Sequence, residues 1–376
     1  MLNRAKLMQA LEGVTNQLFI DTTQAHTLAR ELWHKISTDA TFIYKVKASH
    51  APWPLPTWQG NLSDAIAVAP SISNYHVLSV DGSQIYPDRH QGLGCFLINI
   101  GSVMLHYGCP NKAVQFDSVP QVFTGHEKEL YEIMPHDLVN CRRQEMELDA
   151  GFALSVQLNK LCTDEVPRVL LFDGSLIFWH LEAKDDTLRT LFLHKYLATL
   201  HGLYEEQMPT AGYVSLPRSR ELVNLLRLAL CNFDAAHADK TDVLDGIVDA
   251  TVASFFLRPF ERTIVFQNHA HINQYYPEPL KPYFFYLHVG NEIGRVEVPA
   301  WIAHDQQLVN VIAQVIIDQC TKGRGYPVVL AEAHEQAVVK GPDRDFFYHL
   351  LHKIGIDNKQ RIALSQKVIK KRGIGI

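Results

Sequence analysis

The tripeptide Asp-Gly-Ser occurs twice, each time after an apolar segment. Asp81 stands in LSVDGSQI and Asp173 in LLFDGSLI, so each carboxylate is expected where a strand meets a turn. Asp-Gly is also a common tight-turn signal, because Gly tolerates positive φ and Asp bonds nearby backbone groups. The shared context favours a common site in which the two carboxylates converge. Mg²⁺ or Mn²⁺ would keep such carboxylates ionised, whereas without a cation one of them would have a raised pKa.

A third carboxylate is expected from the helix predicted over residues 137–162. Glu147 lies at the N-terminal end of an apolar stripe that continues to Leu161, and a carboxylate buried there requires a partner or a metal ion. Glu145 lies on a more mixed face and remains the alternative. The alternative without a functional role is that Glu147 points outward into solvent.

A fourth element is the segment GYPVVLAEAHEQA, residues 325–337. Pro327 suits the first turn of a helix, and His334 then lies on the inward side with Leu330. A lone His on an apolar face can equally be a satisfied core histidine. Tyr326 is eight residues earlier, about 12 Å along a helix axis, so the two side chains are not expected to reach the same backbone atom.

Several arginines could contact nucleic-acid phosphates. Arg89 lies in the polar loop that follows Asp81, Arg143 one turn before Glu147, and Arg218 in PRSR. The alternative for each is a solvated side chain. Binding to phosphates through such residues would be independent of sequence and would weaken steeply with added salt.

The apolar pattern predicts the elements that must position these residues. Three strands in meander order are expected from YHVLSVDGS, GCFLINIG and SVMLHYG, followed by a central buried strand in RVLLFDGS. Further strands are expected at 211–216, near RTIVFQ, and in a hairpin around 290–294. Helices are expected at 187–206, 219–231, 305–322, 327–339 and 343–354. This order indicates an α/β fold with a mixed sheet and helices on its faces.

Three regions are predicted along the chain. Residues 1–60 form an N-terminal helical arm with a Pro- and Trp-containing connector, 61–345 form the main domain, and 346–376 form a C-terminal helix and basic tail. The balance of 35 Lys and Arg against 40 Asp and Glu gives a formal charge of −5, so a polyanion must be met by a local basic patch. Six Cys without a CxxC pair, and no apolar run near the roughly 20 residues of a membrane helix, predict reduced thiols, a cytoplasmic location and no membrane insertion.

Five blocks, in order over roughly residues 75–340, resemble the NurA nuclease family. The blocks are VDGSQIYPDRH (80–90), RRQEMEL (142–148), LLFDGSLI (170–177), AGYVSLPRSRELVNLLR (211–227) and YPVVLAEAH (326–334). The resemblance implies an RNase H-like core, Mn²⁺-dependent (or Mg²⁺-dependent) DNA exo- and endonuclease activity, and a homodimer. It also implies partnership with the hexameric HerA translocase in processing DNA double-strand ends.

The resemblance also assigns roles to individual residues. The metal-binding acids would fall on Asp81, Glu147 and Asp173, and the late histidine and tyrosine of the family on His334 and Tyr326. In phosphodiester hydrolysis a metal pair can lower the pKa of the attacking water and stabilise the leaving oxygen. His334 would then bind one ion or handle a proton near the leaving group.

Two rival functions compete with this one. An ATP phosphotransferase of the actin and sugar-kinase type also places Asp near Gly on hairpins, but usually with one residue between them. Here Asp and Gly are contiguous in both copies, and no Walker-type loop occurs. The second rival is a catalytically silent DNA-binding or scaffold subunit of a translocase, against which the presence of every expected acid argues.

Overall fold

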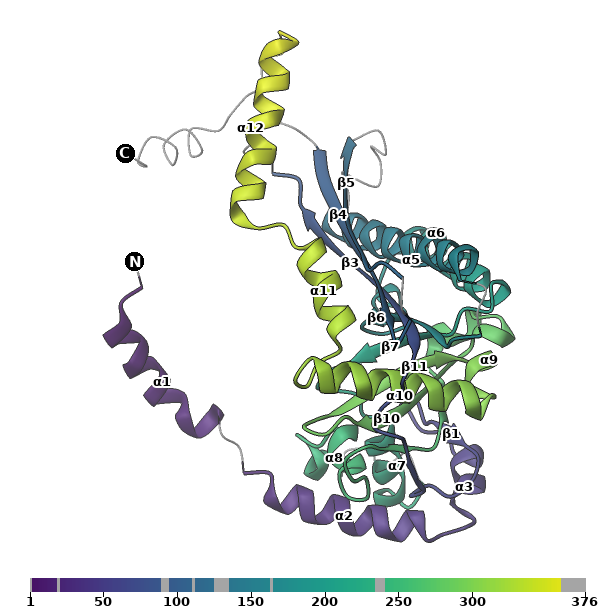
Figure 1. The fold of residues 1–376 in the computed structure, drawn as a ribbon. Coiled ribbons are helices and arrows are strands. Elements are labelled where there is room, and N and C mark those ends of the chain that lie inside the picture. Colours follow the sequence, from purple (N-terminus) through teal and green to yellow (C-terminus); the bar gives the residue numbers. More distant parts are fainter. Residues whose placement is uncertain are drawn as a thin grey trace.

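The computed structural model describes residues 2–18, 21–88, 95–109, 112–124, 135–162, 165–233 and 241–359. The structure is a mixed sheet of eleven strands with helices on both faces (Figure 1). The strands are β1 (Thr57–Trp58), β2 (Ala65–Ala67), β3 (Tyr75–Ile85), β4 (Cys95–Tyr107), β5 (Gln115–Thr124), β6 (Arg168–Asp173), β7 (Thr210–Val214), β8 (Glu261–Thr263), β9 (Phe266–Gln267), β10 (Pro282–His288) and β11 (Ile293–Pro299).

The sheet combines two parallel pairings at its centre with antiparallel pairings on either side. The main path runs β1-β9-β10-β11-β7-β6-β3-β4-β5. β6 is parallel to both β3 and β7, and the other neighbouring strands on this path are antiparallel. β10 and β11 form the hairpin predicted around residues 290–294. The predicted mixed α/β architecture is therefore confirmed.

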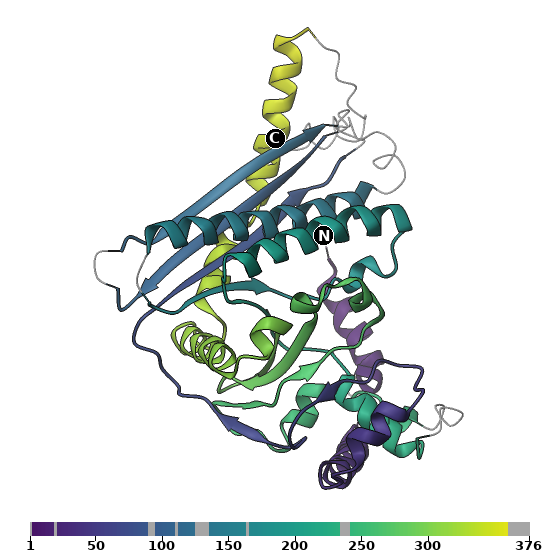
Figure 2. The ribbon, with the colours of Figure 1, turned by 90° about the vertical axis from the view of Figure 1, so that its right-hand side faces the viewer.

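Helices cover the two faces of the central sheet. The helices are α1 (Arg4–Leu18), α2 (Thr23–Ser37), α3 (Phe42–Ala48), α5 (Pro135–Leu161), α6 (Asp186–Glu205), α7 (Glu221–Leu230), α8 (Asp249–Ala253), α9 (Ala300–Ala303), α10 (Gln306–Lys322), α11 (Val328–Ala337) and α12 (Gly341–Asp357). α10 and α11 pack on the face of β3 that carries Tyr75 and Val77. α5 packs with α6 on the opposite face, which carries Leu78 and Val80; Figure 2 shows these two long helices side by side. No helix in the described ranges is both long and apolar enough to cross a membrane.

The N-terminal and C-terminal segments differ in how they contact the central sheet and its helices. α1 extends away from the rest of the described chain (Figure 1), whereas α2 and α3 share a buried apolar cluster with α7, and β1 pairs with β9 in the sheet. α12 continues without a break through residue 345. The predicted boundaries at residues 60 and 345 stay predictions, and the basic tail from residue 360 lies outside the described residues.

The prediction of three strands before α5 is wrong in its division of the chain. GCFLINIG and SVMLHYG form one 13-residue strand, β4, and the third strand of the meander is β5. The boundary expected between these two segments falls at Gly101, which lies inside β4 opposite Asp81. β5 was missed because most of its residues are exposed and it contains Pro120, which an edge strand tolerates.

The glycine at position 101 serves close packing. A Cβ atom on Gly101 would lie 2.4 Å from the backbone N of Ala337 and 2.6 Å from the carbonyl O of Ala333, so only glycine lets α11 approach β4 this closely. Ser83 and Asn99 donate side-chain hydrogen bonds to the Ala337 carbonyl at 2.5 and 2.8 Å, which fixes the C-terminal end of α11 on the sheet.

We therefore expect Gly101→Ala to be destabilising. The added methyl group meets backbone atoms that cannot rotate away, and overpacking of this kind costs about 1–3 kcal/mol. Urea unfolding should show a lower midpoint than that of the wild type. Gly13→Ala on α1, where the Cβ atom would meet nothing within 4 Å, is the matched control and should leave the midpoint unchanged or slightly raised. Equal midpoints for Gly101→Ala and wild type would contradict the packing argument.

Candidate active site

Asp81 and Asp173 lie next to each other on neighbouring parallel strands. The pairing of β3 with β6 ends at Val80 and Phe172, and the two aspartates are the next residues of these strands. Side chains alternate along a strand, so both carboxylates lie on the face covered by α10 and α11. The structure thus brings together the two carboxylates expected to converge.

The two Asp-Gly-Ser copies nevertheless have different conformations. β6 ends at Asp173, and Gly174 has a φ of +113°, so the second copy is a strand followed by a turn, as predicted. Asp81 lies inside β3, which continues to Ile85, so the expected turn after Asp81 is wrong. The backbone of Gly82 is extended, and its lack of a side chain leaves room for a neighbouring side chain.

Glu147 occupies the space that the missing side chain of Gly82 leaves. A Cβ atom on Gly82 would lie 2.6 Å from Oε1 of Glu147 and 2.8 Å from Cγ of Arg143. Residue 82 faces α5, so Glu147 approaches the two aspartates from the face of the sheet opposite α11. It can do so because β6 ends at Asp173, and beyond that point β3 pairs with no described strand on this side. The Glu147 side chain is 16% exposed. Burial of the apolar stripe at Gly151, Leu154 and Leu158 fixes this orientation of α5.

Glu145 points toward a different part of the molecule. Its carboxylate pairs with Arg142 at 2.6 Å and with Lys195 of α6 at 2.8 Å. Both contacts lie between α5 and α6, and Glu145 is not among the groups that shift the pKa of Asp173. Of the two glutamates that the sequence left open, only Glu147 is placed with the aspartates.

The pKa values of Glu147 and Asp173 are both raised, in part by the negative charge of neighbouring acids. The pKa of Glu147 is raised to about 8, first by burial and then by the charges of Asp81 and Asp173, while Arg143 acts in the opposite direction. The pKa of Asp173 is also raised, by burial and by Asp81, against the hydrogen bond from Tyr326 and the nearby His334. Excess negative charge at one point is the electrostatic condition for a cation site.

Tyr326 and His334 each contact one of the two aspartates. His334 Nδ1 lies 2.8 Å from Oδ2 of Asp81, and the Tyr326 hydroxyl donates to Asp173. The expectation that they do not share one target agrees with this placement. His334 is not inward, however: its side chain is 60% exposed, and Leu330, Ala333 and Ala337 form the buried face of α11. The core-histidine alternative is therefore wrong.

The arginines expected to contact phosphate are placed differently from one another. Arg143 forms an ion pair with Glu147 and donates to the carbonyl of Gly82 at 3.1 Å, so it orients an acid of the site. Arg218 is exposed in the loop after β7. Arg89 lies outside the described residues. Phosphate contact by these three residues stays a prediction.

Sequence reasoning missed the residue that holds the second Asp-Gly-Ser turn. Glu297 of β11 accepts hydrogen bonds from Ser175 Oγ at 2.6 Å and from the backbone N–H of Leu176 at 2.9 Å. Arg295 pairs with Glu297 at 2.7 Å and with Glu221, the first residue of α7, at 2.9 Å. The signal was available: two opposite charges at i and i+2 in a strand that is otherwise apolar.

A comparison with known families and structures completes this description. A family model described as the NurA domain matches residues 75–339. A crystal structure of NurA with manganese aligns at 11% identity and a TM-score of 0.41, covering 92% of this chain and 98% of that chain. A crystal structure of NurA bound to dAMP and manganese aligns at 11% identity and a TM-score of 0.31, covering 89% and 94%. No curated protein matches the chain.

Proposed function

Because the chain belongs to the NurA family, we propose that it is a metal-dependent DNA nuclease that hydrolyses phosphodiester bonds at the site around Asp81. One observation carries the proposal: Asp81 and Asp173 end up side by side on adjacent strands, and Glu147 from α5 fills the space beside Asp81 at Gly82, so that the charge of Asp81 raises the pKa of both Glu147 and Asp173. Three acids that approach from both faces of a sheet need a positive partner, and Arg143 supplies a single charge.

The donor set fits a hard divalent cation. Asp81, Glu147 and Asp173 would supply carboxylate oxygens, which Mn²⁺ and Mg²⁺ prefer, and His334 would add an imidazole nitrogen that Mn²⁺ accepts more readily. When bound, such an ion lowers the pKa of water and stabilises negative charge on a phosphodiester. The preference for Mn²⁺ over Mg²⁺ is part of the proposal.

The protein's own residues orient the acids and move protons. Tyr326 holds the carboxylate of Asp173, and Arg143 holds that of Glu147. His334 uses Nδ1 toward Asp81, so Nε2 is the nitrogen left to hold or give a proton. The high exposure of His334 leaves it accessible to a polymeric substrate.

A groove at the C-terminal end of β3, beyond the acids, offers a path for a strand of nucleic acid. It has a volume of about 470 Å³ and is lined by residues 84–88 of the segment that continues from Asp81, with His136, Lys340 and Arg344. Arg344 lies 3.8 Å from Asp88 and is 56% exposed, so its guanidinium can exchange that contact for a phosphate. This local positive charge suits a polyanion despite the formal charge of −5.

The direct test is removal of the metal. Purified protein should degrade linear DNA with Mn²⁺ and lose that activity in EDTA, because the acids alone repel the phosphodiester. Activity should return when Mn²⁺ is restored and should fall as salt rises. Undiminished cleavage in EDTA would overturn the metal mechanism, and binding without cleavage under all metals would favour the silent scaffold subunit.

We expect His334→Ala to reduce the cleavage rate more than DNA binding. Loss of a proton-transfer group typically costs roughly 10²-fold or more in rate. His334 touches one aspartate and no buried apolar cluster, so the fold should be retained. Gln336→Ala on the same helix is the control and should cleave at the wild-type rate. Single-turnover cleavage and a DNA-binding titration measure the two effects, and an unchanged rate for His334→Ala would exclude the histidine from the reaction.

Further features of the family extend this proposal. The order β5-β4-β3-β6-β7, with β6 and β7 parallel to β3, supports an RNase H-like core. We propose a homodimer that acts with a HerA-type hexameric ATPase in processing DNA double-strand ends. A cytoplasmic location stays a prediction from the sequence.

A further inference from the structure

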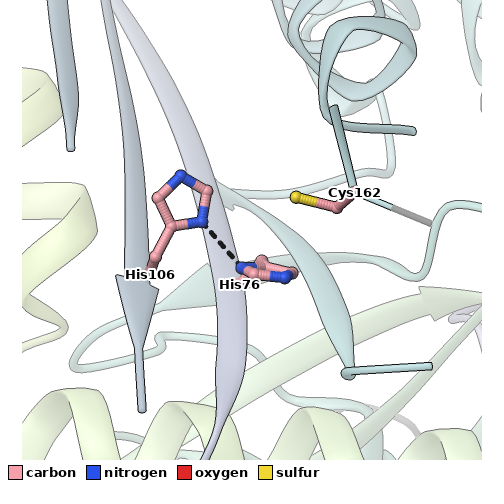
Figure 3. A group of neighbouring side chains, drawn as sticks. All are labelled: His76, His106 and Cys162. Atoms are coloured by element: carbon pink, nitrogen blue, oxygen red, sulfur yellow. Dashed lines mark hydrogen bonds between the residues drawn. The ribbon is translucent and has the colours of Figure 1, made fainter. Parts of the chain in front are cut away.

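A second group of metal-binding side chains lies on the face of the sheet opposite Asp81. His76 of β3 and His106 of β4 are direct cross-strand partners, and Cys162 follows the last residue of α5 (Figure 3). Their ligand atoms all lie within 4.8 Å of one another. Asp81 is five positions after His76 on β3, about 17 Å at 3.4 Å per residue, so this group is distinct from the acid site.

The geometry already aims the donor atoms at one another. The two Nδ1 atoms are 2.7 Å apart, and the rings meet edge to face with centroids 4.7 Å apart. A hydrogen bond between two Nδ1 atoms requires that one of them presents its lone pair. A metal ion takes the place of that shared proton and lets both lone pairs point inward. His76 and Cys162 are fully buried, and His106 is half-buried.

From this arrangement we propose that His76, His106 and Cys162 bind Zn²⁺. Two imidazole nitrogens and one thiolate are borderline and soft donors, the set that zinc prefers, whereas Mn²⁺ and Mg²⁺ prefer the oxygen donors around Asp81. Binding converts the Cys162 thiol to a thiolate and releases its proton to solvent. Three protein ligands leave the fourth tetrahedral position to a water molecule or another donor.

The position of the site gives the ion a structural task. It would join the C-terminal end of α5 to β3 and β4, and α5 carries Glu147 toward Asp81 of the same β3. Arg168 already ties this region together through a 2.7 Å hydrogen bond to the Cys162 carbonyl. A bound zinc ion would fix the helix that presents the third acid. Sequence reasoning could not find this group, because its three residues are 30 and 56 positions apart and match no compact zinc motif.

The test uses the full chain after removal of metals with a chelator. We expect the tightest-bound equivalent of Zn²⁺ to raise the melting temperature, and one equivalent of Co²⁺ to give a cobalt–thiolate charge-transfer band, which only a site with a thiolate ligand can produce. Cys162→Ala should lose the band and weaken zinc binding by roughly 100-fold or more. Cys95→Ala, which removes another buried thiol from the same strand as His106, is the matched control and should keep both.

Two further variants make the outcome decisive. His106→Gln changes a half-buried ligand and serves if Cys162→Ala fails to fold; it should also weaken zinc binding. Asp81→Asn should bind Zn²⁺ and give the cobalt–thiolate band like the wild type, so this test is independent of nuclease activity. Absence of the band in wild-type protein, or wild-type zinc affinity in folded Cys162→Ala or His106→Gln, would overturn the proposal.

Discussion

Replacing Asp81 by asparagine should abolish Mn²⁺-dependent DNA cleavage. Asp81 is the acid at the centre of the group: it adjoins Asp173 on the neighbouring strand, contributes to the raised pKa of Glu147, and contacts His334. Asparagine keeps the size of the side chain but removes the charge that a divalent ion requires. We expect a loss of roughly 10³-fold or more in rate. Asp173→Asn should have a comparable effect.

A closely matched control separates this effect from a change in the strand. Asp117 of β5 is exposed, and its carboxylate accepts the backbone N–H of the next residue at 2.9 Å. Asp81 makes the same local contact with Gly82 at 2.8 Å. Asp117→Asn should therefore cleave DNA like the wild type. Circular dichroism and thermal melting verify folding of both variants, and full activity of folded Asp81→Asn would remove the basis of the proposed function.

The second large effect distinguishes Glu147 from Glu145, the two glutamates of α5 that could supply the third acid of the site. Glu147→Gln should lose roughly 10²- to 10³-fold in cleavage rate, because a metal ligand is lost. It should destabilise the metal-free protein less than Glu145→Gln does, because burial and the neighbouring aspartates raise the pKa of Glu147 to about 8 and so disfavour its charged form in the folded state at neutral pH. Activity and stability therefore move independently in this variant.

Glu145→Gln should show the opposite pattern. Its carboxylate is 11% exposed and pairs with both Arg142 and Lys195, so the substitution leaves two cations without their partner. We expect a loss of about 1–3 kcal/mol in the free energy of unfolding, with cleavage within a few-fold of the wild type. Rates measured with saturating Mn²⁺, together with urea unfolding, test both variants. Loss of cleavage in Glu145→Gln with retention in Glu147→Gln would reverse the assignment.

The sequence was most informative where apolar periodicity and burial coincide. The apolar stripe of α5 correctly orients Glu147, and the apolar run before Asp173 correctly predicts β6 and the turn after it. Periodicity favoured Glu147 but left Glu145 open as an alternative, because the decision depends on Lys195 of α6 and Gly82 of β3. Partners distant in the sequence leave no local pattern.

Glycine was the main source of error. Gly82 and Gly101 lie inside strands, where a local reading takes them for turn and break. Each is required because another element approaches closely: the side chain of Glu147 in one case and the backbone of α11 in the other. His334 was misplaced for a different reason. Helical spacing grouped it with Leu330, but the buried face of α11 is formed by Leu330, Ala333 and Ala337, and His334 lies at the exposed edge of that face, where it contacts Asp81.

The polar contacts that run from Ser175 through Glu297 and Arg295 to Glu221 extend the site well beyond its motifs. Glu221 begins α7, and the apolar side of α7 is covered by α2, which precedes the segment matched by the family model. Residues 75–339 alone would therefore expose that side to water. Glu221, the last residue in this series of contacts, would then lie on a helix, α7, that has lost its packing against α2. We therefore expect the candidate site to depend on α2, although α2 lies outside the segment that the family model matches.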